Sequence, residues 1–310
     1  MTQTEVAHDW QGLAIRPFYV IQQRQHLGND FAVQYYAESM TDNSVSKIEK
    51  WFFLPPIIFA VLLLVIQFTG RDVEVFLWLN QQGRFAGDTL WISVTTLGDG
   101  LVLFVLILPF IRRRPDLAWS LIVAWLLIAL FIKGIKTSIV TYRPLSIIDP
   151  TQFRLVGAPY RYNSFPSGHA TSAAAFAGTL CIFFRQRWVR VPAIGLMLLV
   201  AFSRIAMGLH WATDVLVGLL GGWVLALLAY LLSSRLTFGR SRVAQIIFGV
   251  VIGGAAIRMF LINHTDYPQA FRLLQTIALG SIVFTICEFA LARRNAKYLQ
   301  ADKAAPQAEH

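Results

Sequence analysis

The sequence predicts an all-α integral membrane protein, with a six-helix core and two additional C-terminal transmembrane helices. Two observations favour this class. Hydrophobic residues make up 56% of the 310 residues and charged residues only 14%, against roughly 25% charged in soluble proteins. Apolar runs of about 20 residues, the length that crosses a bilayer, also recur along the chain. A chain this apolar cannot cover a water-facing surface, so soluble enzymes, disulfide scaffolds and disordered proteins are disfavoured.

The basic balance of the chain is interpreted as membrane orientation. Lys and Arg number 27 against 17 Asp and Glu, which gives a net charge of +10. In a soluble protein this balance would suggest nucleic acid. Here the basic residues lie in short clusters between apolar runs, so we expect the bilayer as partner and no nucleic acid. Cys181 and Cys287 fall inside apolar runs and are predicted to be packing residues.

The elements follow in order along the chain. Residues 1–50 are predicted to be a cytoplasmic segment, without the early apolar core of a signal peptide. A short interfacial helix is expected over 73–79. Eight apolar runs are predicted to span the membrane: 51–70, 89–110, 116–135, 168–184, 190–205, 213–232, 243–262 and 270–291.

The charge of the connecting segments tests this count. If the N-terminus is cytoplasmic, every cytoplasmic connection is rich in arginine, as the positive-inside rule requires. These arginines are Arg112, Arg113, Arg114, Arg185, Arg187, Arg190, Arg235, Arg240, Arg242, Arg293 and Arg294. An even number of spans returns the C-terminus to the cytoplasm, so the tail 292–310 is predicted there. The location expected for the protein is the inner (plasma) membrane.

One long outer segment, about 136–167, is basic, although the other basic clusters lie on the cytoplasmic side. Three motifs at the outer helix ends offer a reason. They are Lys136 to Pro144, Phe165 to His169, and Ser203 to Asp214. The predicted topology places all three at the same membrane face. We therefore expect one site there, facing the periplasm.

The residue types in these motifs suit phosphoryl transfer. Lys136, Arg143 and Arg204 supply the positive charge that a phosphoryl group in transfer needs on its equatorial oxygens. Ser167 and Gly168 begin a helix whose free N–H groups and positive dipole end favour an anion, and glycine lets the backbone come close.

Two histidines and a carboxylate complete the predicted chemistry. His210 and Asp214 are four residues apart, so on a helix they share one face. A carboxylate bonded to one ring nitrogen leaves the other nitrogen free to attack. His169 then remains to protonate the leaving oxygen. Taken singly, each motif has an ordinary structural explanation, such as a helix cap or a snorkelling lysine, but the joint pattern favours function.

The pattern Lys-x6-Arg-Pro, Pro-Ser-Gly-His and Ser-Arg-x5-His-x3-Asp resembles the type 2 phosphatidic acid phosphatase family, which shares phosphate-site motifs with vanadium haloperoxidases. Every signature position is matched: Lys136, Arg143, Pro144, Pro166, Ser167, Gly168, His169, Ser203, Arg204, His210 and Asp214. The resemblance covers residues 51–232, a six-helix catalytic phosphatase core, and leaves 233–291 as two extra transmembrane helices without an assigned role.

The resemblance implies a role for each matched residue. His210 would carry a phospho-histidine intermediate, Asp214 would orient it, and His169 would be the general acid. Phosphate binding is implied for Lys136, Arg143, Ser167, Gly168 and Arg204. The family uses neither a metal ion nor a cofactor, so none is expected.

Two charged residues fall inside predicted spans, where an uncompensated charge costs at least ~2.5 kcal/mol. We hypothesise that Asp99 pairs with Lys133, or supports the Lys136 region from behind. The alternative, that Asp99 sits in a wet helix break between two glycines, has equal weight. Ser203 is expected to bond to backbone or to help hold the site rather than to attack.

On the outer loop before the last span, His264 and Asp266 are interpreted as a solvated turn in preference to a border of the substrate entrance.

The expected function is an integral membrane lipid phosphatase acting at the periplasmic face. The substrate classes are undecaprenyl diphosphate, phosphatidylglycerophosphate, phosphatidic acid and lipid A. The first alternative is a phosphotransferase that passes the phosphoryl group to another lipid, since the sequence does not identify the acceptor. A haloperoxidase is disfavoured because those enzymes are soluble. A lipid transporter or binding protein is disfavoured by the intact His210, Asp214 and His169.

Overall fold

The computed structural model describes residues 48–304, with side chains described as far as Leu291. The predicted cytoplasmic segment 1–50 lies largely outside these residues, and the predicted tail 292–310 lies outside them from residue 305 onward. The described elements are all helical, apart from an isolated bridge between Tyr142 and Tyr162. The longer helices are α3 (Leu54–Thr69), α4 (Asp72–Gln82), α8 (Pro115–Ser138), α10 (Gly168–Phe183), α11 (Arg187–Ala206), α12 (Ala212–Arg235), α13 (Arg242–Leu261) and α14 (Phe271–Ala304).

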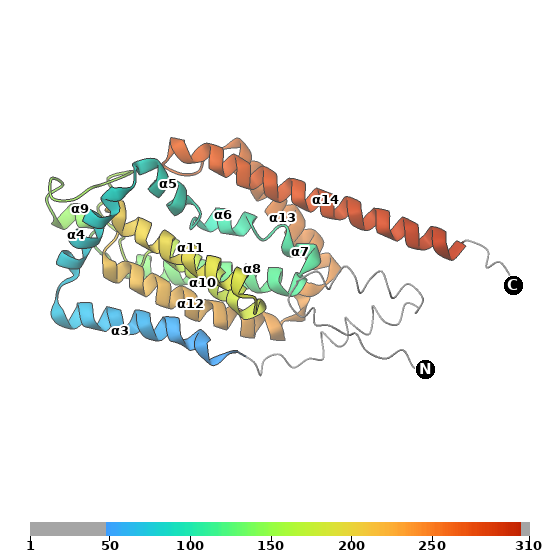
Figure 1. The fold of residues 1–310 in the computed structure, drawn as a ribbon, viewed down its shortest axis with the longest axis horizontal. Helices are drawn as coiled ribbons and strands as arrows, with labels where there is room; N and C mark the ends of the chain where they lie inside the picture. The colour runs from blue at the N-terminus through green and yellow to red at the C-terminus, as the bar shows by residue number, and fades with distance from the viewer. Residues whose placement is uncertain (1–47, 305–310) are drawn as a thin grey trace, which may run out of the picture. The chain divides into compact units, whose positions relative to one another are not determined.

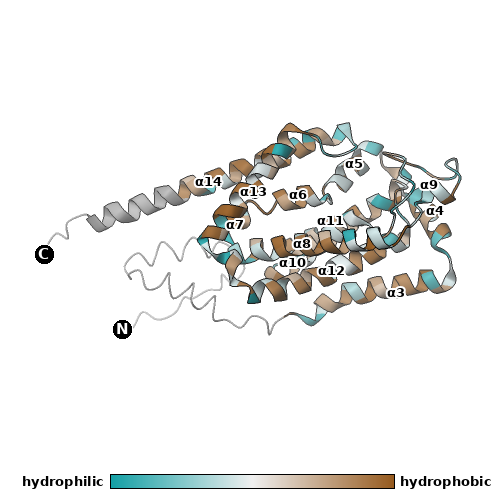
Figure 2. Cartoon of the chain, turned by 180° about the vertical axis from the view of Figure 1, so that it is seen from behind, coloured by the Kyte–Doolittle hydropathy of each residue, from teal (hydrophilic) through white to brown (hydrophobic). Residues whose placement is uncertain are grey.

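Within the described residues, six helical segments are long and apolar enough to cross a membrane. These are 50–69, 115–138, 187–206, 212–235, 242–261 and 268–291. The all-α membrane class is therefore confirmed. Helix α10, predicted as a span over 168–184, has 16 residues and is apolar but shorter. Figure 2 shows that α3 consists largely of hydrophobic residues, with hydrophilic residues near its ends.

The second predicted span, 89–110, is wrong as a continuous helix. The structure divides it into α5 (Asp88–Thr96), α6 (Gly100–Val105) and α7 (Phe110–Arg113). The physical reason is Asp99, which has an extended backbone and accepts hydrogen bonds from the backbone N–H groups of Leu101 and Val102. A carboxylate in this geometry caps the start of a new helix, so Asp99 separates α5 from α6.

Helix α10 lies at the centre of the core and packs against α8, α11 and α12 (Figure 1). Its buried face is built from small residues such as Ala170, Ala174 and Ala177. Small side chains let neighbouring helices approach closely, which is how helices associate where no water drives them together. Helix α3 packs on α12, where the Trp223 indole donates to the Phe52 carbonyl at 2.9 Å.

The two C-terminal helices pack against the broken segment. Helix α13 contacts α14, α6 and α7, and α14 also contacts α6. One apolar cluster joins Val102 and Leu117 with Ile252, Met259 and Leu274, all buried. This helix pair therefore covers the part of the fold where the second predicted span is interrupted.

The helix directions give the core two chemically different ends. The C-terminal ends of α8 and α11 and the N-terminal ends of α10 and α12 share one end, and α4 and α9 (Pro144–Ile147) lie there too (Figure 1). The opposite end carries the arginine clusters. There Arg190 forms an ion pair with Glu49 at 2.8 Å, and Arg113 forms one with Glu288 on α14.

Candidate active site

His210 lies in the turn between α11 and α12, and its side chain is 2% exposed. The Nδ1 atom faces Oδ2 of Asp214 at 3.4 Å. Asp214, in the first turn of α12, is itself held by the Trp211 backbone N–H at 2.9 Å and by the Ser164 hydroxyl. Because Nδ1 faces the carboxylate, Nε2 is the nitrogen left for chemistry.

The turn that carries His210 depends on Gly208, which has a φ of +74°. A Cβ atom at this position would lie 2.4 Å from the Arg154 carbonyl oxygen. Only glycine combines the left-handed backbone with this close approach. Gly208 falls inside the third motif, and the spacing argument did not single it out.

The N-terminus of α10 lies beside this pair. Ser167 stands at the N-cap position, and its backbone N–H donates to the Asp214 carbonyl at 3.1 Å. The first helical bond runs from the Thr171 N–H to the Ser167 carbonyl at 3.0 Å. The N–H groups of Gly168 to Ala170 therefore precede the helical ladder, as in an anion-binding helix end.

Lys136, in the last turn of α8, and Arg143, in the loop that follows α8, lie near His210 and Asp214. Arg143 donates from Nη1 to the carbonyl of Leu209 at 3.1 Å and from Nε to that of Tyr162 at 3.0 Å. Burial and the charge of Arg204 lower the pKa of Arg143 to about 10, so its guanidinium stays charged at neutral pH. The charges of Arg143, Arg204 and Asp214 all act on Lys136.

Arg204, near the end of α11, is the most deeply buried of the three cations, with 6% exposed. Its Nη1 donates to the Thr95 hydroxyl on α5 at 2.6 Å, and the Tyr267 phenol interacts electrostatically with its guanidinium. His169, in the first turn of α10, lies within electrostatic reach of His210, Lys136 and Arg204. The structure thus gathers residues from all three motifs around one point.

Two buried polar atoms in this group have no partner among the described residues. They are the Ser167 hydroxyl oxygen and Nε of Arg204. Buried polar atoms in proteins are nearly always hydrogen-bonded, so an unpartnered pair is informative. Both can donate to an anion, and both stand among positive charges.

Three further residues support the site and were not predicted. Asp72, at the start of α4, accepts from the backbone N–H of Thr213 at 3.2 Å and from its hydroxyl at 2.5 Å, which holds the N-terminus of α12. Asn80 donates to the carbonyls of Ile205 and Ala206 at the end of α11. Thr95 holds Arg204, as described above. These contacts join segments far apart in sequence, so local spacing could not reveal them.

The proposed pairing of Asp99 with Lys133 is wrong. Oδ1 of Asp99 faces Nε2 of His264 at 3.0 Å, and Lys133 is exposed on α8. The alternative interpretation, a helix break at Asp99 between Gly98 and Gly100, agrees with the structure. The Ser203 hydroxyl donates to the Val200 carbonyl at 2.6 Å, which agrees with the expected bond to backbone.

The other two basic residues of the long loop do not join the site. Arg154 forms an ion pair with Asp88 and donates to the carbonyls of Gly83 and Ala86. Arg161 donates to the Leu145 carbonyl at 3.3 Å. The basic charge of this loop therefore serves both the site and the loop's own structure.

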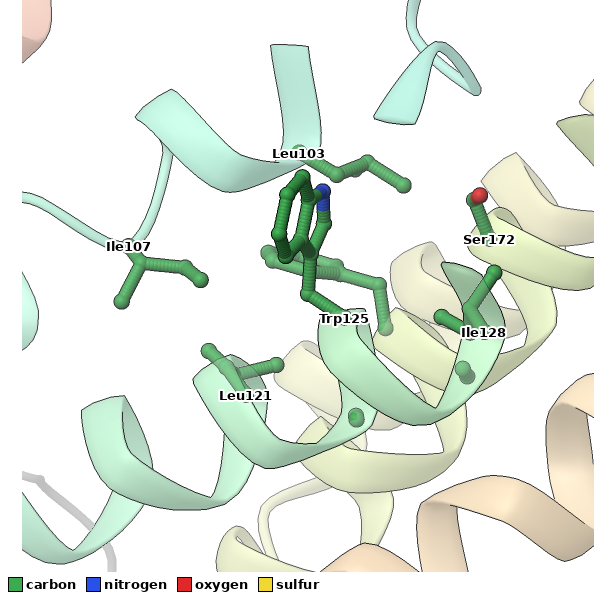
Figure 3. Close-up of a pocket in the computed structure, with 9 residues that line it drawn as sticks. Leu103, Ile107, Leu121, Trp125, Ile128 and Ser172 are labelled. Carbon is green, nitrogen blue, oxygen red and sulfur yellow. The ribbon is translucent and has the colours of Figure 1, made fainter. Parts of the chain in front are cut away.

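An apolar crevice lies beside the site, between α6, α8 and α10 (Figure 3). Its volume is about 20 Å³, enough for roughly one water molecule and far too small for a lipid chain. Ser172, one turn from His169, supplies the hydroxyl at one side, and the Trp125 indole lies among the aliphatic side chains.

Comparisons with known proteins agree with this geometry. Residues 117–234 match the family model described as the PAP2 superfamily, which confirms the resemblance over the segment that holds all three motifs. An undecaprenyl-diphosphatase from Sulfolobus acidocaldarius is 27% identical over 197 residues, covering 57% of this chain and 88% of the relative. A lipid A 1-phosphatase from Rhizobium etli is 28% identical over 149 residues, covering 44% of this chain and 63% of the relative.

Among solved structures, LpxE from Aquifex aeolicus aligns with 25% sequence identity and a TM-score of 0.45. The alignment covers 51% of this chain and 93% of that protein. The family match ends at residue 234, so α13 and α14 lie beyond it.

Proposed function

We propose that this chain is a PAP2-type lipid phosphatase that hydrolyses a lipid phosphate or diphosphate through a phospho-histidine on His210. The observation that carries the proposal is the pair of unpartnered buried donors, the Ser167 hydroxyl and Nε of Arg204, beside a buried histidine and three cations. Donors and cations arranged in advance around one point stabilise the charge of a phosphoryl group in transfer.

The first half-reaction transfers the phosphoryl group to the enzyme. Nε2 of His210 attacks the terminal phosphorus, and the bond from this phosphorus to the lipid alcohol oxygen breaks, or, in a diphosphate, the bond to the bridging oxygen, which leaves with the lipid monophosphate. His169 donates a proton to the departing oxygen. Asp214, 3.4 Å from Nδ1, holds the ring in the tautomer that attacks and stabilises the cation that forms.

The second half-reaction regenerates the enzyme. His169, now deprotonated, takes a proton from water, and the water oxygen attacks phosphorus. The bond between phosphorus and Nε2 breaks, and inorganic phosphate leaves. Lys136, Arg143, Arg204, Ser167 and the N–H groups of α10 hold the equatorial oxygens in both steps. None of these steps calls for a metal ion or a cofactor.

The site is proposed to face the periplasm, with both termini in the cytoplasm. The arginine clusters lie at the end of the core opposite the site, where the positive-inside rule expects the cytoplasm. A lipid could then leave its chains in the bilayer while the headgroup enters at the helix ends. The relatives that act on undecaprenyl diphosphate and lipid A support these two substrate classes, beside phosphatidylglycerophosphate and phosphatidic acid.

The decisive experiment measures phosphate release by purified protein from these four lipid classes, with a chelator added. Wild type should release phosphate from at least one class, and His210→Ala and His210→Asn should lose at least about 10⁴-fold in rate, because the nucleophile is gone. A denaturing quench at alkaline pH with labelled substrate should trap a phosphoryl group that is stable to base and labile to acid, on wild type alone. Full turnover by a folded His210→Asn protein would falsify the assignment.

The alternative function is a phosphotransferase with the same intermediate and a lipid acceptor. A labelled diphosphate lipid supplied together with lipid A separates the two functions. Label in free phosphate supports the hydrolase, and label on lipid A supports the transferase.

A further inference from the structure

The loop that joins α13 to α14 lies against the catalytic cluster, although it is outside the family match. Ala270, in the short helix Pro268–Ala270, is fully buried with Met207 and Leu209, which flank the turn that carries His210. The Tyr267 ring lies so close to Gly157 that a Cβ atom there would be 2.7 Å from it. The loop is therefore packed into the site end of the core.

His264 on this loop contacts the Asp99 carboxylate. Nε2 of His264 lies 3.0 Å from Oδ1 of Asp99, and the side chains are 12% and 21% exposed. The same oxygen accepts from the N–H groups of Leu101 and Val102, which fixes the carboxylate at the start of α6. The loop thus contacts the helix break between α5 and α6.

The helix break in turn touches His169. A Cβ atom on Gly98 would lie 3.2 Å from the carbonyl oxygen of His169 and 3.4 Å from its Cβ. The charge of Asp99 acts on the His169 ring, together with those of Arg204, His210 and Lys136. Asp99 therefore stands between His264 and the proposed general acid.

Tyr267 on the same loop reaches a second member of the site. Its ring packs against the apolar cluster that contains Ala206 and Met207, which closely follow Arg204 in the chain, and its phenol interacts electrostatically with the Arg204 guanidinium. The loop itself is braced, since the Asn263 amide donates to the Tyr267 carbonyl at 3.0 Å.

We propose that the loop between α13 and α14 supplies two positioning residues to the site: His264, which acts through Asp99 on His169, and Tyr267, which acts on Arg204. This inference rests on the proposed function. The negative charge of Asp99 acts on the His169 ring, and His264 holds that carboxylate in place. Tyr267 keeps the Arg204 guanidinium aimed at the phosphoryl oxygens. The two added helices thereby complete the catalytic centre.

The test for His264 compares two leaving groups. His264→Ala should lower kcat about tenfold or more on a lipid alkyl phosphate, whose oxygen needs a proton, and about twofold or less on p-nitrophenyl phosphate, whose phenolate leaves unaided. His264→Gln, which keeps a neutral donor, should recover part of the loss. Equal losses on the two substrates, or none on either, would overturn the role of His264.

The test for Tyr267 measures phosphate affinity. Tyr267→Phe removes only the hydroxyl and should raise KM, and the inhibition constant of inorganic phosphate, about threefold to tenfold, because the phenol no longer interacts with the Arg204 guanidinium. For Tyr267→Phe, the ratio of kcat on the lipid alkyl phosphate to kcat on p-nitrophenyl phosphate should equal the wild-type ratio. Unchanged phosphate inhibition would overturn the role of Tyr267.

Glu288→Gln is the matched control, because it removes the ion pair with Arg113 from the same helix pair at the far end. It should leave both rates unchanged, and thermal unfolding in detergent should show all variants folded. If wild type itself releases no phosphate from any substrate, the proposed function fails and this inference with it. If wild type is active and the loop variants match it, this inference alone fails.

Discussion

Burial among positive charges sets the protonation state of His210 in this site. His210 lies outside the membrane-spanning segments, and burial, with the charges of Arg204, Arg143 and Lys136, lowers its pKa well below the ordinary 6.5. A histidine with a lowered pKa is neutral at pH 7, and only the neutral ring has a lone pair for attack. The cations that we propose to bind phosphate would therefore also keep the proposed nucleophile neutral.

This environment predicts the pH dependence of the reaction. Activity that requires neutral His210 is present above its pKa in the folded enzyme and is lost as the pH falls through that value, so the acid limb of kcat/KM should lie below pH 6.5. Arg143→Gln should move this limb upward, because one of the charges that lowers the pKa is removed. The second ionisation of a monoester substrate, near 6, is common to both enzymes and cancels in the comparison. An identical limb in both enzymes would contradict the electrostatic role of Arg143.

At the scale of elements, the packing of α10 on α12 sets the distance between the motifs. Gly218 and Gly222 of α12 lie directly against α10: a Cβ atom on Gly222 would be 2.2 Å from the Thr171 carbonyl oxygen, and one on Gly218 would be 2.7 Å from that of Ser167. Two glycines four residues apart are the pattern that lets helices meet closely in a membrane. This contact brings Ser167 and Asp214 together.

A larger residue at this contact should separate the motifs. Gly222→Val forces α12 away from α10, so we expect a loss of about 1–3 kcal/mol in stability and about a 10²-fold fall in kcat/KM, the size expected for a displacement of about 1 Å. Gly253→Ala is the matched control, since its Cβ atom on α13 would meet nothing within 4 Å. That change should leave activity intact and stability equal or slightly higher. Both properties can be measured in detergent, and wild-type activity in Gly222→Val would contradict the argument.

At the scale of the whole molecule, the two ends of the core differ in their residues. One end holds the residues of the proposed site. The other end holds the arginine clusters, in which Arg190 and Arg185 form ion pairs with Glu49. Lys and Arg are retained on the cytoplasmic side during insertion, which orients the whole chain. The same helix directions that collect the three motifs thus also predict the side on which they lie.

Thiol labelling tests this orientation. In a Cys287→Ser background, where the remaining Cys181 is buried, single cysteines replace two exposed residues: Thr151 at the site end and Gln186 at the arginine end. A membrane-impermeant maleimide should label Thr151→Cys in intact spheroplasts, and Gln186→Cys only after permeabilisation. The reverse result would contradict the proposed periplasmic site.

Much of this protein was predictable because its signals are local. Apolar runs report the membrane, since lipid excludes charge from long segments, and they located every longer helix from α8 onward. The spacing of the three motifs predicted a common face, and the structure brings His210, Asp214, Ser167 and Arg204 together. Hydropathy could not detect the break at Asp99, because one carboxylate between glycines barely changes the average of an apolar run.

The partners of these residues were decided by the tertiary structure alone. Asp99 meets His264, 165 positions away, and Arg204 meets Thr95, 109 positions away. A polar side chain buried in the fold must find a partner in space, and separation along the chain does not limit which one it finds. The sequence by itself determined the class of protein and predicted the residues of the proposed site. Only the packing of α13 and α14 against the broken helix decided that a loop outside the family match stands beside the proposed general acid.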